Sequence, residues 1–254
     1  MRISLILCAA ATAFAMPALA QEDEASNGWT GEGSVSAGVT TGNTDTTDVG
    51  IGINIAREFG LWKAGIEAIA DFGQTNSVDT KNRFFLASQL DRQINDGLYS
   101  FGRASYEQDQ FSGFDSRAFF GGGLGYQVYD TDQTQWSISG GPGIKIDEVK
   151  RIVTTDATGA ALIIPAETVT SFGAIASSDF NYAFNDNVSF SNNSDVIYAS
   201  ESTQFINELA ITAALSGALS ARISFDVRHD TNPPIGFKST DTATRVSLVY
   251  GFGK

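Results

Sequence analysis

Residues 219–230 read LSARISFDVRHD, and this stretch decides the fold class. One set of alternate positions is apolar: Leu219, Ala221, Ile223, Phe225 and Val227. The other set is polar or charged: Ser220, Arg222, Ser224, Asp226 and Arg228. Successive side chains of a β-strand point to opposite faces of the sheet, so the stretch predicts a strand with one apolar and one charged face. A helix would mix the two sets.

The same alternation recurs from residue 29 to the end of the chain. It is clear in 49–57, 62–73, 136–147 and 244–252, and weaker in 29–40, 80–92, 98–109, 115–129, 167–183, 188–199 and 203–215. Each segment is about as long as a tilted membrane-spanning strand, which needs roughly 9–11 residues. Proline removes a ladder donor, so we expect a bulge or local distortion at Pro142.

The connections between these segments alternate in length. Short turns are expected at 58–61, 95–97, 130–133, 185–187 and 216–218, and the intervening connections include 110–114, 148–166 and 231–239. Short periplasmic turns and longer outer loops are typical of outer-membrane barrels. We therefore predict an all-β fold for residues 29–254: a closed, antiparallel, up-and-down transmembrane β-barrel of about twelve strands, with both termini periplasmic and no plug domain.

The first residues have the features of a secretory signal. Arg2 precedes the short apolar run 3–16, and Ala18-Leu19-Ala20 forms a cleavage pattern. We predict a signal peptide over 1–20 and a short periplasmic segment over 21–28. Export and strand alternation together predict a protein of the cell outer membrane, because only helices and closed sheets satisfy their backbone in lipid.

The composition limits the expected chemistry. Removing residues 1–20 takes away Arg2 and no acid, so the net charge changes from −13 to −14. An acidic surface disfavours nucleic acid. Cys8 is the only cysteine and His229 the only histidine, so no disulfide, metal site or cofactor is expected. The expected partners are outer-membrane lipid, the barrel-assembly machinery during biogenesis, and small ions or solutes.

Parity places many charged side chains inside the predicted barrel. The candidates are Glu32, Lys63, Glu67, Asp71, Arg83, Arg222, Asp226, Arg228 and Arg245. They could form a paired network or a polar path for small ions, and the cost of an unpaired interior charge favours the network. Gly121, Gly123 and Gly125 share this parity, and they either leave the lumen open or make room for Phe119 or Phe85.

Aromatic residues gather at one predicted rim of the barrel. They are Trp29, Trp62, Trp136, Tyr250 and Phe252. Amphipathic rings favour a membrane interface, so we interpret them as interface aromatics. The alternative is a set of core tryptophans in a soluble β-sandwich.

Two features leave other functions open. The loop 148–166 contains Val149, Ile152, Val153, Leu162, Ile163 and Ile164. Such an apolar loop could bind a partner, enter lipid, or extend its two strands as a hairpin. His229 has outward parity, as in a phospholipase-type hydrolase, but a nucleophile and an orienting group are also required. We expect no enzyme, and we interpret Gly42-Asn43-Thr44 as a tight turn rather than an ion site.

Several motifs occur in a fixed order along the chain. They are Trp29-x-Gly31-x-Gly33, Gly38, Gly42-Asn43-Thr44, Asp109-x-Phe111, Asp115-x-Arg117, Gly121-x-Gly123-x-Gly125-Tyr126 and Tyr250-Gly251-Phe252. In this respect the chain resembles the YdiY-like family of salt-induced outer-membrane proteins, defined by a domain of unknown function. The resemblance implies an outer-membrane barrel and supplies no catalytic residues. The expected function is an undefined envelope role, related to salt stress or to a narrow passive channel.

Overall fold

The computed structural model describes residues 28–76, 78–155 and 161–253. The predicted signal peptide 1–20 and residues 21–27 of the predicted periplasmic segment lie outside the described residues. Twelve long strands form the body of the molecule: β1 (Trp29–Thr41), β2 (Thr46–Phe59), β3 (Trp62–Thr75), β4 (Val78–Gln93), β5 (Leu98–Asp109), β6 (Phe114–Asp130), β7 (Thr134–Val149), β10 (Glu167–Asn185), β11 (Val188–Ala199), β12 (Gln204–Ser216), β13 (Leu219–Asp230) and β14 (Thr240–Phe252). Within the described ranges, no helix is long and apolar enough to cross a membrane.

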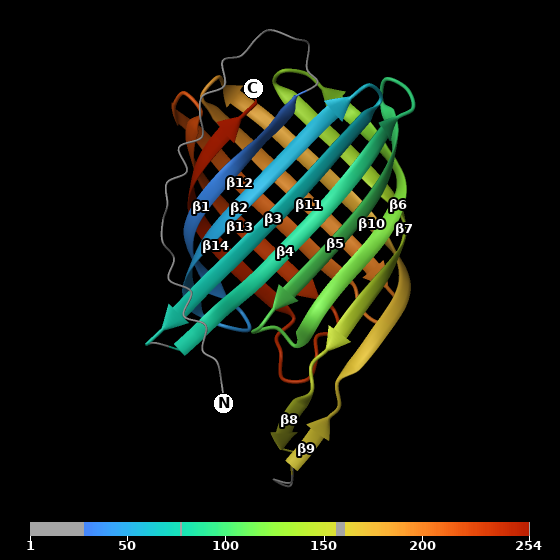
Figure 1. The fold of residues 1–254 in the computed structure, drawn as a ribbon, viewed down its shortest axis with the longest axis vertical. Coiled ribbons are helices and arrows are strands. Elements are labelled where there is room, and N and C mark those ends of the chain that lie inside the picture. Colours follow the sequence, from blue (N-terminus) through green and yellow to red (C-terminus); the bar gives the residue numbers. More distant parts are fainter. Residues whose placement is uncertain (1–27, 77, 156–160, 254) are drawn as a thin grey trace.

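The strands form one closed antiparallel barrel (Figure 1). Neighbours in sequence pair with each other, and β1 closes the ring against β14 from Gly31 opposite Phe252 to Thr41 opposite Thr242. Closure leaves no unpaired sheet edge, which is the condition for a sheet to stand in lipid. The predicted fold class and strand number are confirmed.

The barrel is apolar outside and charged inside. Outward side chains such as Val35, Ile51 and Phe172 are 63%, 58% and 80% exposed. By contrast, the largest fully buried side chains in the described part of the chain are Asp48 and Asp71. A soluble β-sandwich has the reverse arrangement, with apolar side chains in its core. The apolar half of each alternating strand therefore forms the outer wall.

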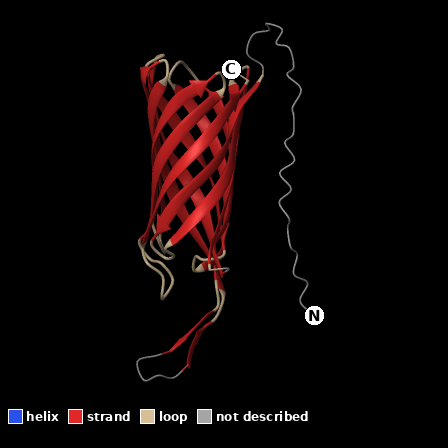
Figure 2. Cartoon of the chain, turned by 90° about the vertical axis from the view of Figure 1, so that its left-hand side faces the viewer, coloured by secondary structure: helices blue, strands red, loops and turns tan. Residues whose placement is uncertain are grey.

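The two ends of the barrel differ as the loop lengths predict. The short turns lie at the end that holds the start of β1 and the C-terminus (Figure 1). The loop 148–166 projects from the other end, and within it β8 (Ile152–Thr155) and β9 (Ala161–Ile164) form a separate two-stranded sheet (Figure 2). Of the forms considered for this loop, the structure has the hairpin.

Pro142 produces an interruption rather than a bulge. Pro142 lies opposite Ala174 of β10 in an unshifted register. On the β6 side, pairing passes from Gly121 opposite Gly143 to Leu124 opposite Gly140, and the two positions between are unpaired. Proline has no backbone N–H to donate. At this position the β6–β7 ladder is broken locally, and the β7–β10 ladder is continuous. The expectation of a bulge or local distortion at Pro142 is therefore met by this local distortion.

A small cluster of apolar side chains lies inside the barrel and packs against glycines of the wall. Phe101, Phe119, Ile175 and Ile197 form this buried cluster, with Tyr99 packed against it. A Cβ added at Gly121 would lie 2.6 Å from Phe119 Cζ, and the Tyr99 ring occupies the corresponding space at Gly125. Gly121 and Gly125 therefore make room for large side chains, whereas a Cβ at Gly123 would meet the backbone of Gly140. Phe119 is one of these side chains, whereas the Phe85 ring lies against the Arg83 guanidinium carbon, with 5.4 Å between that carbon and the ring centroid.

Candidate functional site in the barrel interior

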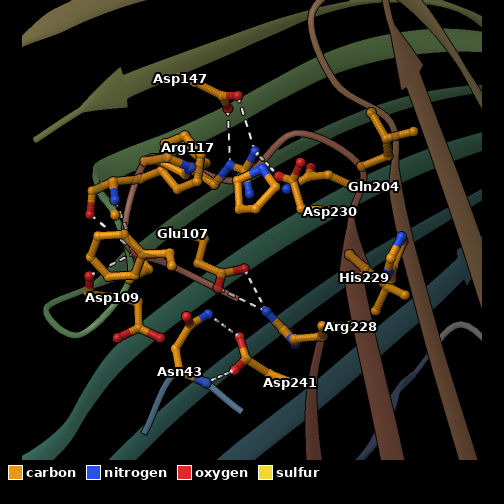
Figure 3. A pocket seen from close by; sticks show the side chains of 18 of the residues that line it. Asn43, Glu107, Asp109, Arg117, Asp147, Gln204, Arg228, His229, Asp230 and Asp241 are labelled. Atoms are coloured by element: carbon orange, nitrogen blue, oxygen red, sulfur yellow. Dashed lines mark hydrogen bonds and ion pairs between the residues drawn. The ribbon is translucent and has the colours of Figure 1, made fainter. Parts of the chain in front are cut away.

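An ion pair crosses the lumen between opposite walls. Arg228 of β13 donates from Nη1 to both carboxylate oxygens of Glu107 on β5, at 2.7 and 2.9 Å. These two strands stand six positions apart in either direction around the twelve-strand ring. Arg83 of β4 donates from Nε to the same Glu107 carboxylate at 3.0 Å. One carboxylate therefore links two arginines across the full width of the barrel (Figure 3).

Further pairs at this level connect the remaining walls. Arg83 Nη1 lies 3.0 Å from Asp71 Oδ2, and Arg245 lies 3.6 Å from Asp71 and 3.8 Å from Asp48. Arg245 also pairs with Asp226 of β13. We call this set the ionic brace: Asp48, Asp71, Arg83, Glu107, Asp226, Arg228 and Arg245. Asp71 and Arg83 are 1% and 4% exposed, so this part of the brace is buried in the barrel interior.

A second layer of ion pairs lies on the loop side of the brace. Arg117 of β6 makes a bidentate contact with Asp147 at 3.0 Å for both bonds. Its Nη2 also reaches Asp230 of β13 at 2.7 Å. Lys145 lies 2.9 Å from Asp147 and donates to Ser202 Oγ at 2.6 Å. Because β6 and β13 stand five positions apart in the ring, this layer spans the lumen as well.

The connection between β13 and β14 folds across the mouth of the barrel at the end with the longer loops. We call residues 231–239 the lid. A Cβ added at Gly113, in the β5–β6 connection on the far wall, would lie 2.6 Å from Pro234 Cγ and 2.9 Å from Phe237 Cδ2. The lid therefore reaches from one side of the mouth to the other.

Neighbouring loops hold the lid and its landing point in place. Asn43 donates from Nδ2 to Lys238 O at 3.2 Å and accepts from Lys238 N at 2.5 Å. Gly42 beside it has φ +133°, as a tight turn requires. On the far wall, the Lys150 ammonium donates to the carbonyls of Asp109, Gln110 and Ser112 at 2.7–3.0 Å. Burial lowers the pKa of Lys150, and Asp115 and Asp109 oppose that shift.

A cavity lies between the lid and the ion-paired layers. Its empty space is about 1090 Å³, including the part that opens to solvent. Charged side chains of both signs line it, among them Lys81, Arg83, Glu107, Arg117, Asp147 and Asp230. In Figure 3, Glu107 and Arg228 point toward each other, as do Arg117 and Asp147, whereas His229 lies apart from them. The half of the lumen beneath the lid is therefore a charged chamber.

The other half of the lumen is more open and more acidic. Inward side chains such as Asp179 and Asn193 are exposed there. Arg103 pairs with Asp195 at 2.7 Å, and Arg222 pairs with Glu32 at 2.6 Å. Among the described residues of this half, four inward carboxylates form no ion pair: Glu67, Asp91, Asp179 and Glu208. This region therefore carries uncompensated negative charge facing accessible space.

The charged residues singled out from the sequence separate into three groups. The brace contains Asp71, Arg83, Asp226, Arg228 and Arg245. Two residues form pairs outside the brace: Glu32 pairs with Arg222 in the more open half of the lumen, and Lys63 forms an exposed pair with Glu58 at the rim, at 3.4 Å. Glu67 belongs to the unpaired carboxylates. Their role in function stays a prediction.

Sequence reasoning missed several members of the interior network. They are Asp48, Arg103, Glu107, Arg117, Lys145, Asp147, Asp195, Glu208 and Asp230. Parity could have found some of them, because Arg103 and Glu107 alternate with Ala104 and Tyr106 in 98–109. That segment alternates weakly, so its faces were not assigned.

The rim aromatics lie at strand ends on the short-turn side of the barrel. Trp29 and Trp62 are 49% and 39% exposed. Arg57 lies 5.7 Å from the Trp29 ring centroid, and Arg92 lies 5.6 Å from that of Trp62. Trp136 stacks on Tyr129 with 6.1 Å between ring centroids. Tyr250 and Phe252 end β14 at the same rim, with Tyr250 60% exposed, and the interface role of all five stays a prediction.

The His229 ring is hydrogen-bonded to a hydroxyl group on the neighbouring strand. Its Nδ1 lies 2.8 Å from Thr240 Oγ1, across the β13–β14 pairing. A serine nucleophile and a third orienting group would be needed beside it. Among the described residues, no group of three or more histidine, cysteine, aspartate or glutamate side chains is arranged to hold a metal ion.

The closed sheet, its apolar outer wall and its charged interior define the class of outer-membrane-type β-barrels. The chain belongs to the family described as "Protein of unknown function, DUF481", whose profile matches residues 33–252. It is 24% identical over 229 residues to the uncharacterized protein YdiY of Escherichia coli (strain K12), covering 86% of this chain and 82% of YdiY. The resemblance to a YdiY-like family is confirmed.

Solved structures share the fold at low sequence identity. The NanC porin superposes with a TM-score of 0.52 at 12% identity, covering 86% of this chain and 98% of the porin. The translocator domain of the autotransporter NalP from Neisseria meningitidis gives 0.52 at 13% identity, covering 88% of each chain. A porin and a translocator use the same architecture, so the fold alone does not assign the activity.

Proposed function

We propose that this protein is an outer-membrane channel for small solutes that favours cations and is closed at its outer half by the ionic brace. The observation that carries the proposal is the division of the lumen. Uncompensated carboxylates face the open half, and ion pairs between opposite walls fill the other. The porin fold of NanC and the family resemblance support an outer-membrane location.

The cation preference rests on the acidic half of the lumen. Rings of carboxylates in a pore raise the local concentration of cations and lower that of anions. Glu67, Asp91, Asp179 and Glu208 come from β3, β4, β10 and β12, so their charge is spread around the wall rather than concentrated at one point. A cation entering from this end meets attraction before it reaches the brace.

Reversal potentials in planar bilayers under a salt gradient test this preference. Replacing Asp179→Asn and Glu208→Gln together should lower the cation-to-anion permeability ratio by about twofold or more, because two of the four uncompensated charges are lost. The matched control is Asp96→Asn with Asp132→Asn, which removes two charges from the short turns. Equal effects of the two pairs, or an anion preference of the parent protein, would refute the proposal.

A salt-stress role has one physical feature in its favour. The closure consists of ion pairs, and ionic strength weakens such pairs, most strongly where water reaches them. Arg228 is the most exposed member of the brace, with its side chain 33% exposed. Conductance should then rise more steeply with KCl concentration than the conductivity of the solution does, and a strictly proportional rise would remove this role.

Surface binding by the hairpin is a second candidate. Val153 and Ile163 pair across β8 and β9 and are 62% and 53% exposed, outside the barrel wall. Exposed apolar side chains on a projecting hairpin suit contact with a partner or with lipid. Deleting residues 151–165 should leave conductance unchanged under the channel proposal. Under the binding proposal, the deletion should abolish retention of partner cells or proteins.

A further inference from the structure

A cluster of polar side chains interrupts the apolar outer wall. We call it the outer polar cluster: Ser178 of β10, Asn192 and Ser194 of β11, and Asn207 of β12. Their neighbours in sequence point the other way: Ser177 donates to the lumen residue Asp195, and Asp195 pairs with Arg103. By strand alternation the cluster faces outward, where a membrane-spanning barrel meets lipid.

The cluster lies near mid-height of the wall. Ser178 is opposite Ser194, and Ser194 is opposite Asn207, so one row crosses three strands. Ser194 is six residues above the start of β11. With a rise of about 3.3 Å per residue and a tilt of about 40°, it stands roughly 15 Å above the turn, inside an apolar band about 25 Å tall.

The side chains around the cluster are apolar. Phe180 and Phe190 lie on its turn side and pack edge to face, with 6.3 Å between ring centroids. Phe205 and Leu209 flank Asn207 on the same face of β12 and are 38% and 37% exposed. Trp136 donates from Nε1 to Ser178 Oγ at 3.1 Å on the turn side, so Ser178 has a partner outside the cluster. The other members form a polar patch within an apolar part of the lipid-facing wall.

Hydrogen bonds within the cluster satisfy it only in part. Asn207 Nδ2 donates to Ser194 Oγ at 2.8 Å and to Asn193 O at 3.2 Å. Ser194 Oγ lies 3.4 Å from Asn192 Oδ1. Within the described residues, Asn207 Oδ1 accepts no hydrogen bond, although it is only half-buried and faces outward. An acceptor left open to acyl chains is unfavourable, because lipid offers no donor.

The wall beside the cluster carries small outward side chains. Gly140 and Pro142 of β7 and Ala174 and Ala176 of β10 share its outward parity. Small side chains let a second membrane-embedded surface approach closely. On the opposite side of the barrel, β4 presents the bulky side chains of Phe84, Leu86 and Leu90 outward.

We propose that a second copy of this chain docks on this face, wall to wall within the membrane, to form a two-fold symmetric dimer. Amide and hydroxyl groups carry both donors and acceptors, so the outer polar cluster is complementary to itself across a two-fold axis. The occupant must present polar groups at the same depth in the bilayer. A second copy meets that condition by construction, whereas acyl chains do not.

Cysteine cross-linking in the outer membrane tests the proposal. Cys8, in the predicted signal peptide, is the only cysteine of the chain, so Ser194→Cys introduces a single reporter thiol into the mature protein. The matched control is Ser88→Cys, another outward serine, on β4 five positions away around the ring. Mild oxidation should give a reducible dimer with Ser194→Cys and none with Ser88→Cys or the parent chain. Monomer alone, or equal dimer yields for the two variants, would overturn the proposal.

A second measurement separates the cluster from chance collision. Ser194→Ala with Asn207→Leu should lower the dimer fraction in detergent, measured by sedimentation, about fivefold or more. The barrel should still show its heat-dependent shift on a gel, which reports an intact fold. An unchanged dimer fraction in a folded variant contradicts the inference. Either result leaves the channel proposal standing, because conductance concerns the lumen of one barrel.

Discussion

Arg228 and Glu107 meet at 2.7 Å in the middle of the lumen, although β13 and β5 stand on opposite sides of the barrel. A contact between neighbouring strands would join two parts of the same wall. This contact ties the far walls together, and Arg83 and Asp71 extend it sideways. The interior is therefore structured by charge where a soluble protein uses an apolar core.

The first prediction concerns the stability of the brace. Glu107→Ala leaves Arg83 and Arg228 without their shared carboxylate inside the barrel. Removing one partner of a buried pair costs about 3–5 kcal/mol of unfolding free energy. Urea unfolding in lipid vesicles measures this loss. The control is Glu58→Ala, whose exposed pair with Lys63 should contribute about 1 kcal/mol or less, and equal losses for the two variants would contradict the buried pairing.

The second prediction concerns the glycines under Phe119. A methyl group at Gly121 would meet Phe119 Cζ at 2.6 Å and Pro142 O at 3.0 Å. Gly121→Ala should therefore destabilise the barrel by about 1–3 kcal/mol through overpacking. Gly65→Ala is the matched control, because a Cβ there meets only Ile55 O at 4.0 Å. The same unfolding assay compares them, and a Gly65→Ala loss as large as that of Gly121→Ala would show that packing against Phe119 is not the cause.

The third prediction concerns the lid. Ser105 lines the cavity beneath it, so Ser105→Cys places a thiol inside the chamber. Replacing Pro233, Pro234 and Phe237 by glycine should speed labelling of that thiol by a membrane-impermeant reagent severalfold. A cysteine at Val153, on the projecting hairpin, should label equally fast with either lid. If the lid replacement leaves the Ser105→Cys rate unchanged, the lid does not close the mouth.

The alternation of apolar and polar residues specifies much of this fold, because one face of each strand meets lipid and the other meets the polar lumen. The stretch 219–230 matches β13 residue for residue, and 98–109 and 188–199 match β5 and β11. The predicted ends fall short where the alternation fades. β14 begins at Thr240 rather than 244, and β2 at Thr46 rather than 49, because the strands there carry polar side chains on both faces.

The candidate site was less predictable than the fold. Parity assigns Arg228 to the lumen, but it cannot show that Arg228 meets Glu107, since the two residues lie 121 positions apart and their contact depends on barrel closure. The lid was recognised only as a longer loop, 231–239. Its path across the mouth depends on contacts with Gly113 and Asn43 that no local pattern encodes.

Single-channel recording in planar bilayers tests the central claim most directly, with the parent protein compared with the Glu107→Ala, Arg228→Ala double variant. The double variant removes the contact between opposite walls without changing the net charge, and Arg83 keeps Asp71 as its partner. The account predicts low conductance for the parent protein and a severalfold increase for the double variant. Equal conductance of the two proteins would contradict closure of the lumen by the ionic brace.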